Sequence, residues 1–195
     1  MISEITVHDS KLFTIEHLYD STENEELISN FTVRGNAAGL ENYLKYSSFD
    51  DEDGNLSRTY LVKDKMTREL AGYFTLRTGL ITQKIPADND KEVFDSLPAI
   101  ELSNFAVNSQ YKSHHPDMER VGLYMVQNFV FPLAKCISNF VGVNALYLYA
   151  LPFEKLIKHY ETMGFSRLPP ELEQFVQAHV KPKYDEGCIF MYQTL

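Results

Sequence analysis

The segment AIELSNFAV, from Ala99 to Val107, decides how this chain folds. Apolar Ile100 and Leu102 alternate with polar residues, which is the pattern of a β-strand with one face in a core. The alternation stops at Asn104–Val107. The lapse is either an ordinary irregularity or a β-bulge, which turns unpaired backbone groups outward. The sequence leaves both interpretations open.

A long helical segment follows this strand after a basic and polar loop. Apolar residues recur at helical spacing from Asp117 to Phe140, which predicts a helix with one buried face. Pro132 lies inside the segment and has no backbone N–H, so it should bend or split the helix near Phe131.

The remainder of the second half alternates strands and helices. An apolar strand is expected over Val143–Tyr149 and a helix over Phe153–Met163. Gly164 fits the left-handed C-terminal cap of that helix, and Phe165 begins another strand. The pattern closes with two further elements: a helix over Glu171–His179 and a strand over Gly187–Thr194.

The first half predicts a mixture of the same elements. They are a strand over Lys11–Leu18, a helix over Ala37–Tyr46, and two antiparallel strands, Thr59–Lys63 and Glu69–Leu80, joined by a polar turn. A short helix is expected between the polar segment Pro86–Asp90 and Pro98. Asp50–Gly54 has the composition of a calcium loop, but Phe49 and Tyr60 occupy the first and twelfth ligand positions, so a solvated turn is predicted.

Composition limits the class of protein. The chain has 195 residues, of which 44% are hydrophobic, and it contains 13 Phe and 12 Tyr, so a substantial core is expected. The formal net charge of −9 argues against a surface that broadly attracts nucleic acid. Basic residues do recur close together at Lys63, Lys65 and Arg68, at Lys155 and Lys158, and at Lys181 and Lys183.

Neither a metal site nor a membrane segment is expected. Cys136 and Cys188 lack metal-ligand spacing and are predicted to be free thiols. The adjacent His114 and His115 have no second ligand cluster nearby, so solvated side chains are expected and no metal. The uncharged run Cys136–Phe153 is broken by polar residues and Pro152, and the amino terminus has no secretory signal. We therefore expect a soluble cytoplasmic protein.

Short blocks of sequence, taken together in order, resemble the acetyl-CoA-dependent N-acetyltransferases of the GNAT superfamily. The pattern is closest to the acetyltransferases that act as toxins of toxin–antitoxin pairs. The blocks are Gly39–Leu44, Ser57–Val62, Ala71–Leu76, Phe105–Val107 with Tyr111 and Lys112, Val141–Leu146, and His159–Phe165. The resemblance implies one α/β (α+β) domain over residues 1–195, with a mixed, mostly antiparallel sheet of about six or seven strands flanked by helices and splayed at its fourth and fifth strands.

The resemblance implies where acetyl-CoA would bind. The backbone of Phe105, Ala106 and Val107 would face the thioester and its oxyanion. The pyrophosphate would lie at the helix start, near Lys112 and near Arg120, Val121 and Gly122. The superfamily's loop reads Gln/Arg-x-x-Gly-x-Gly/Ala, and only Gly122 matches, because Arg120 stands where the first glycine belongs. Asp117 and Glu119 would repel the phosphates.

The resemblance also suggests catalytic residues. Tyr160 would bind CoA and lies where a phenol can protonate its departing thiolate; from the residues alone it is interpreted as a core tyrosine. Glu101 is a candidate base on the cofactor strand, with a structural glutamate as the alternative. His159 is expected on an exposed helix face. No nucleophilic residue is needed.

Three functions follow. The first is transfer of acetyl from acetyl-CoA to a primary amine in a ternary complex, with the acceptor open. The second is acetylation of aminoacyl-tRNA, which would bring a small antitoxin protein as partner and which the acidic charge disfavours. The third is a non-catalytic binding module that keeps the fold and has lost the phosphate loop. A homodimer remains an open alternative to a monomer.

Overall fold

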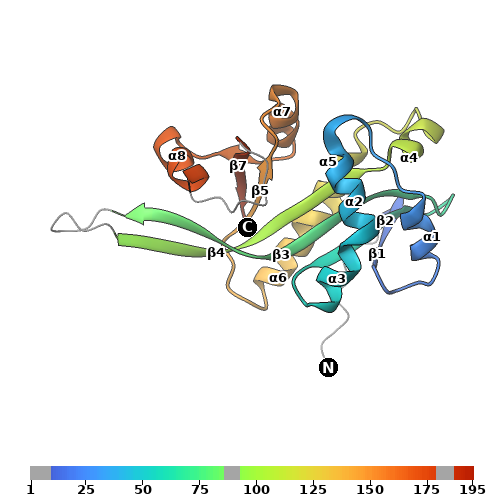
Figure 1. Ribbon diagram of the computed structural model, residues 1–195, viewed down its shortest axis with the longest axis horizontal. Helices are drawn as coiled ribbons and strands as arrows, with labels where there is room; N and C mark the ends of the chain where they lie inside the picture. Colours follow the sequence, from blue (N-terminus) through green and yellow to red (C-terminus); the bar gives the residue numbers. More distant parts are fainter. Residues whose placement is uncertain (1–9, 86–92, 179–186) are drawn as a thin grey trace. The chain divides into compact units, whose positions relative to one another are not determined.

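A seven-stranded sheet, in the order β1-β2-β3-β4-β5-β7-β6, organises the chain (Figure 1). The computed structural model describes residues 10–85, 93–178 and 187–195. The β1–β2, β2–β3, β5–β7 and β6–β7 registers are antiparallel, and the β4–β5 register is parallel. The predicted fold class, a mixed and mostly antiparallel sheet flanked by helices, is confirmed.

The chain forms two compact units, and β3 and β4 contribute residues to both. Unit 1 comprises Met1–Arg77 and Leu102–Leu133, and unit 2 comprises Thr78–Glu101 and Ala134–Leu195. The single domain predicted over residues 1–195 stays a prediction. Among the described residues, no helix is both long and apolar enough to cross a bilayer.

Unit 1 contains the amino-terminal strands and most of the helices. Its elements are β1 (Phe13–His17), α1 (Asn24–Ser29), a short 3-10 helix η1 (Gly35–Ala37), α2 (Ala38–Tyr46), α3 (Ser48–Asp53), β2 (Arg58–Asp64), the first part of β3 (Leu70–Ile85), the last part of β4 (Val93–Val107), α4 (Ser109–His114), α5 (Val121–Met125), the π-helix η2 (Val126–Val130) and the start of α6 (Phe131–Ser138). A cluster of fully buried side chains that includes Phe31, Leu44, Leu61 and Tyr73 forms its core. The apolar residues that predicted these elements therefore meet in one place.

Unit 2 contains the carboxyl-terminal strands. Its elements are the last part of β3, the first part of β4, most of α6, β5 (Ala145–Ala150), α7 (Glu154–Thr162), β6 (Ser166–Arg167), α8 (Pro170–Ala178) and β7 (Ile189–Thr194). Buried Ala99, Ala145, Tyr147, Val176 and Phe190 form its core. Cys136 and Cys188 are free thiols, as expected.

The parallel β4–β5 register is short. It pairs Ala99, Ile100 and Glu101 with Ala145, Leu146 and Tyr147. Beyond these pairs β4 continues to Val107 and β5 to Ala150, and in the described residues the β4–β5 register contains no further pair. The β-bulge, one of the two interpretations of Asn104–Val107, stays a prediction. A register shift is observed between β2 and β3, at Val62 and Lys63.

The long helical segment changes its winding before the proline, as predicted. α5 is followed by the π-helical residues Val126–Val130, in which the N–H of Phe131 bonds the carbonyl of Val126, five residues back. Pro132 lacks the N–H that a regular turn would use, and a widened π turn is one way a helix accommodates such a defect. The helix begins at Val121, within the Arg120–Gly122 segment that was expected to open it.

Two sequence predictions were wrong. Asp50–Asp53 belongs to α3 and is not a turn, because Ser48 and Glu52, spaced by four, are both buried and make one face of this helix. The short helix predicted before Pro98 is also absent from its described part, where β4 begins at Val93 and runs through the proline. Residues 86–92, the rest of that segment, lie outside the described residues.

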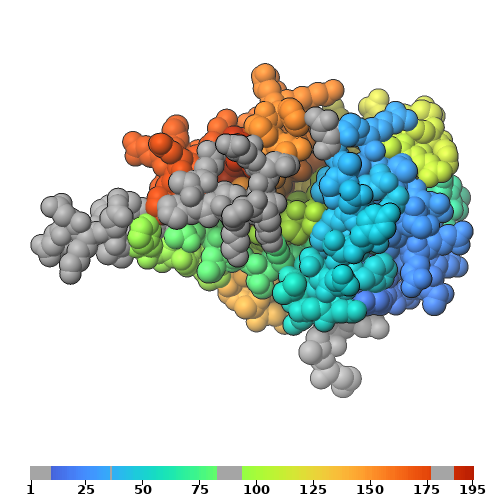
Figure 2. Space-filling model, in the orientation of Figure 1, coloured from blue at the N-terminus to red at the C-terminus, as the bar shows by residue number. Residues whose placement is uncertain are grey.

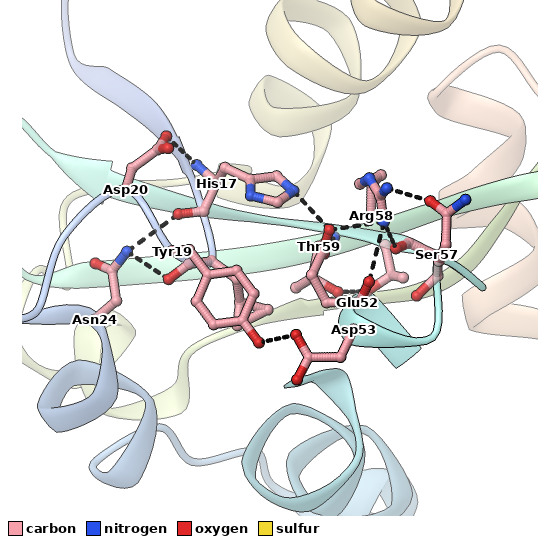
Figure 3. Close-up of polar contacts among 12 residues, drawn as sticks. His17, Tyr19, Asp20, Asn24, Glu52, Asp53, Ser57, Arg58 and Thr59 are labelled. Carbon is pink, nitrogen blue, oxygen red and sulfur yellow. Dashed lines mark hydrogen bonds and ion pairs between the residues drawn. The ribbon is translucent and has the colours of Figure 1, made fainter. Parts of the chain in front are cut away.

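Glu52 joins three elements of unit 1 (Figure 3). Its side chain is only 4% exposed. Its Oε1 lies 3.0 Å from Nε2 of His17 on β1 and 2.9 Å from Nη1 of Arg58 on β2. Its Oε2 accepts a hydrogen bond from the N–H of Thr59 at 3.1 Å. One buried carboxylate thus ties α3 to β1 and β2.

Glu52→Ala should lower the free energy of unfolding by about 2 kcal/mol, because it leaves the Thr59 N–H and part of the Arg58 guanidinium without an acceptor. Urea denaturation measures the change. Asp50→Ala on the exposed face of α3 is the control and should change stability by less than about 1 kcal/mol. Equal effects of the two substitutions would show that Glu52 is not a special anchor.

Candidate active site

Apart from Tyr160, the cofactor-binding residues inferred from the family resemblance lie in unit 1, beginning at the end of β4. Phe105 and Val107 are half-buried and Ala106 is buried. Asn108 fixes the end of this strand, because its N–H donates to the Ala71 carbonyl at 2.8 Å and its side-chain amide donates to the Leu70 carbonyl at 2.8 Å. Asn108 also caps α4 by accepting from the N–H of Gln110.

Gly72 permits a close approach of main chain to this strand. A Cβ on Gly72 would lie 2.6 Å from the Ala106 carbonyl oxygen and 2.8 Å from Sδ of Met125. Both distances are shorter than van der Waals contact, so a side chain would push β3 away from Ala106 or displace α5. Close packing within unit 1 therefore explains why this sequence block contains a glycine at position 72.

The start of α5 presents backbone donors. Arg120 has φ 55° and ψ 33°, the left-handed conformation that glycine adopts most easily. It occupies the position where the superfamily loop has its first glycine. The first helical hydrogen bond runs from the N–H of Tyr124 to the Arg120 carbonyl. Within the described residues, the N–H groups of Val121, Gly122 and Leu123 donate no hydrogen bond, which suits an anion.

The loop before this helix is anchored by two histidines. His114 Nδ1 and His115 Nε2 lie 2.5 Å from Oε1 and Oε2 of Glu69. The histidines were expected to be solvated, and they are instead ion-pair partners of one carboxylate when protonated. Among described residues, no group of three or more His, Cys, Asp or Glu side chains could hold a metal ion. Lys112, on α4, is exposed, as is Arg120.

Tyr160 lies in unit 2, in the last turn of α7. The N–H of Phe165 bonds the Tyr160 carbonyl at 3.1 Å, and the N–H of Gly164 bonds the Glu161 carbonyl at 3.0 Å. With Gly164 at φ 99°, this is a Schellman motif, as the predicted cap required. The Tyr160 and Phe165 rings meet edge to face with centroids 5.9 Å apart. The cap therefore fixes the backbone and ring of Tyr160.

The hydroxyl of Tyr160 remains a proton donor at neutral pH. Burial raises its pKa from 10.0 to about 12. Tyr160 is only half-buried as a whole residue, and within the described residues its hydroxyl makes no side-chain hydrogen bond. The adjacent His159 is exposed, as predicted. These properties suit a general acid and do not suit a base.

Glu101, also in unit 2, is buried and 4% exposed. Its Oε2 accepts a hydrogen bond from the Tyr147 hydroxyl at 3.0 Å. The sequence reasoning missed Tyr147, which appeared there only as one apolar position of a strand. The signal that could have found it is register, because Glu101 and Tyr147 are opposite each other in the parallel pair.

Many cations proposed as a basic surface are paired with carboxylates. Lys63 is fully buried and bonds Glu16, so it cannot contribute to such a surface. Arg68 lies 3.6 Å from Glu16, and Lys158 lies 2.6 Å from Glu154. Lys181 and Lys183 lie outside the described residues. Lys63, Lys65 and Arg68 are close together in sequence, but they do not form one basic surface, because Lys63 is buried.

Comparison with known proteins places this fold among toxin acetyltransferases. No family model matches the chain. A tyrosine-to-phenylalanine mutant of the AtaT toxin matches with a TM-score of 0.62 and 18% identity, covering 93% of this chain and 89% of that one. A similar mutant of KacT matches at 0.62 and 19%, covering 94% and 95%. AtaT complexed with acetyl-methionyl-tRNA matches at 0.63 and 18%, covering 93% and 94%. At these identities the matches show the fold alone.

Arg120→Gly should raise the free energy of unfolding by about 0.5 to 1 kcal/mol, because glycine relieves the left-handed strain of a side-chain-bearing residue. Urea denaturation tests this. Arg120→Ala is the matched control: it removes the guanidinium and keeps the Cβ, so stability should not increase. An equal gain in both variants would assign the effect to the charge rather than to the backbone.

Glu69 should make stability depend on acidic pH. Burial raises the pKa of Glu69, but hydrogen bonds from His115, His114 and Thr67 outweigh it, so the net pKa is lowered. A lowered carboxyl pKa contributes stability above the unfolded value, near 4.3, and that stability is lost as pH falls through the folded value. Denaturation from pH 6 to pH 3 should show a shallower loss for Glu69→Gln than for wild type. Identical slopes would contradict the assignment.

Proposed function

We propose that this chain transfers an acetyl group from acetyl-CoA to a primary amine by direct attack in a ternary complex. The observation that carries the proposal is Tyr160, a phenol that is protonated at neutral pH and fixed at the end of α7. The fold supports it, since the solved structures that match include AtaTR bound with acetyl-CoA, with a TM-score of 0.57 and 18% identity.

In this proposal the residues of unit 1 bind the cosubstrate. The N–H groups of Val121 and Gly122 receive the pyrophosphate, and Arg120 and Lys112 supply positive charge beside it. The main chain of Phe105–Val107 receives the pantetheine arm and the thioester oxygen. Acetyl-CoA supplies the acetyl group as an activated thioester. The backbone donors at α5 suit an anion, so the site can still bind a phosphate with Arg120 in place of the glycine.

The residues of unit 2 manage protons. The Tyr160 hydroxyl gives its proton to the sulfur that leaves the acetyl group, and Glu101 accepts the proton that the amine loses. An amine with a pKa of roughly 8 to 10 is mostly protonated at neutral pH, so a base is needed to expose its lone pair. No side chain becomes acetylated in direct attack, so the mechanism gives Cys136 and Cys188 no role.

The acceptor is a primary amine, and charge bears on its class. The surface of α1 and α3 (blue and cyan in Figure 2) exposes Glu25, Glu26, Asp50 and Asp53. Such a surface repels a phosphate backbone. The AtaT complex contains acetyl-methionyl-tRNA, which makes aminoacyl-tRNA a second candidate acceptor. A small antitoxin protein would accompany that candidate, because AtaT also occurs bound to the carboxyl terminus of AtaR.

An acceptor panel separates these classes. Purified protein with labelled acetyl-CoA is offered methionyl-tRNA, spermidine and a peptide with a free amino terminus. Acetylation of methionyl-tRNA alone would select the toxin-like activity. Labelling of the small amines without tRNA would exclude it. No labelling of any amine, together with no binding of acetyl-CoA, would leave the non-catalytic module as the function.

Acetyl-CoA at one hundred times its dissociation constant should stabilise the folded protein by about 2.7 kcal/mol and raise its melting temperature by about 5 to 10 °C. A thermal-shift titration measures this. Arg120→Ala should weaken the shift at a given concentration. The absence of any shift at millimolar acetyl-CoA would contradict the cofactor assignment.

Tyr160→Phe should keep this thermal shift and lower kcat by about 10²-fold or more, because it removes only the proton donor. In the wild type, the raised pKa keeps Tyr160 protonated, so kcat should show no loss of this acid between pH 7 and pH 10. The control is His159→Gln, one residue away on an exposed face. Full turnover in Tyr160→Phe would remove Tyr160 from the mechanism.

A further inference from the structure

We infer that Tyr147 is a positioning residue for Glu101, and that the lack of a side chain at Gly79 leaves room for the Tyr147 hydroxyl. The inference rests on the proposed function, because it deepens the role given there to Glu101. All three residues belong to unit 2, and the observation behind it is one hydrogen bond inside a closely packed aromatic group.

The first step is the contact itself. The Tyr147 hydroxyl donates to Oε2 of Glu101 at 3.0 Å, and both side chains are 4% exposed. A buried carboxylate needs donors, and the bond to one oxygen fixes the rotation of the carboxyl plane. Because Glu101 and Tyr147 are the last pair of the parallel register, the backbone of both strands is held at this point.

The second step is the rigidity of the tyrosine. The Tyr147 ring stacks on Phe190 with centroids 5.3 Å apart and an interplanar angle of 27°. It meets Tyr149 edge to face at 6.0 Å. Phe190 in turn stacks on Tyr192 at 6.3 Å. Aromatic rings have few rotamers, so this group holds the hydroxyl in one direction.

The third step is the space that the hydroxyl occupies. A Cβ on Gly79 would lie 2.1 Å from the Tyr147 hydroxyl oxygen and 2.7 Å from Cε1 of the ring. No side chain fits there while Tyr147 keeps its place. Gly79 lies inside β3, where glycine costs stability relative to other residues. The loss of stability at Gly79 is offset by the room that it gives the Tyr147 hydroxyl to reach Glu101.

The chemical consequence concerns the base. A carboxylate that takes a proton from an amine must point one oxygen at it, and misplacement by about 1 Å costs much of the rate. Tyr147 holds the carboxylate of Glu101 in place and is not itself assigned contact with substrate.

The test is a double-mutant cycle in turnover, with the amine that wild-type protein acetylates fastest among methionyl-tRNA, spermidine and the peptide. Tyr147→Phe keeps the ring and its stacking and removes only the hydroxyl. It should lower kcat about tenfold and leave the KM for acetyl-CoA unchanged. In the Glu101→Gln background the same change should have no further effect.

Tyr192→Phe is the matched control, because Tyr192 pairs with Tyr147 in the β5–β7 register and belongs to the same aromatic group. It should alter kcat by less than twofold. Effects of Tyr147→Phe and Glu101→Gln that multiply independently would overturn the positioning role, as would a change in the KM for acetyl-CoA with kcat unchanged. Full activity of Glu101→Gln would overturn it while the acetyltransferase function stands. A wild type that acetylates no amine would overturn both.

Discussion

The parallel pairing of β4 with β5 ends after Glu101 and Tyr147. The length of this register decides which backbone groups of the two strands bond each other and which do not. Up to that pair, the two strands satisfy each other's backbone groups and help to form the core of unit 2. After it, β4 carries Phe105–Val107 into unit 1 and β5 continues to Ala150. Backbone groups that a neighbouring strand does not use are the groups that can receive the amides of a pantetheine arm.

Glu101 and Tyr147 have a structural role in unit 2, and Glu101 also has the proposed role of a base. Glu101 is buried and held by Tyr147, and Tyr147 is held by stacked aromatic rings. On the unit 1 portion of the chain, Asn108 and Gly72 fix the strand end with hydrogen bonds and close packing. Each unit therefore prepares its own residues by local packing, and no single motif of the sequence contains the candidate site.

Much of the fold could be predicted from local patterns. The apolar run of β5, the glycine cap of α7 and the proline in the long helix each act over a few residues, so a sequence shows them directly. The Asp50–Asp53 helix was missed because its buried face is made by Ser48 and Glu52, which composition does not mark as apolar. The start of β4 at Val93 was missed because Pro98 suggested a break. Pairings such as Tyr147 with Glu101 and Lys63 with Glu16 depend on tertiary structure, so no local pattern reveals them.

The π-helical turn at Val126–Val130 has a consequence for insertions and deletions. A turn that closes on the fifth residue holds one residue more than a regular turn, and each residue of a helix rotates the following side chains by about 100°. The buried side chains of Leu133 and Ala134 therefore depend on that additional residue for their direction. Loss of one codon from this turn would swing α6 out of phase with the residues before it. We expect natural variants to keep the length of this segment even where its residues are substituted.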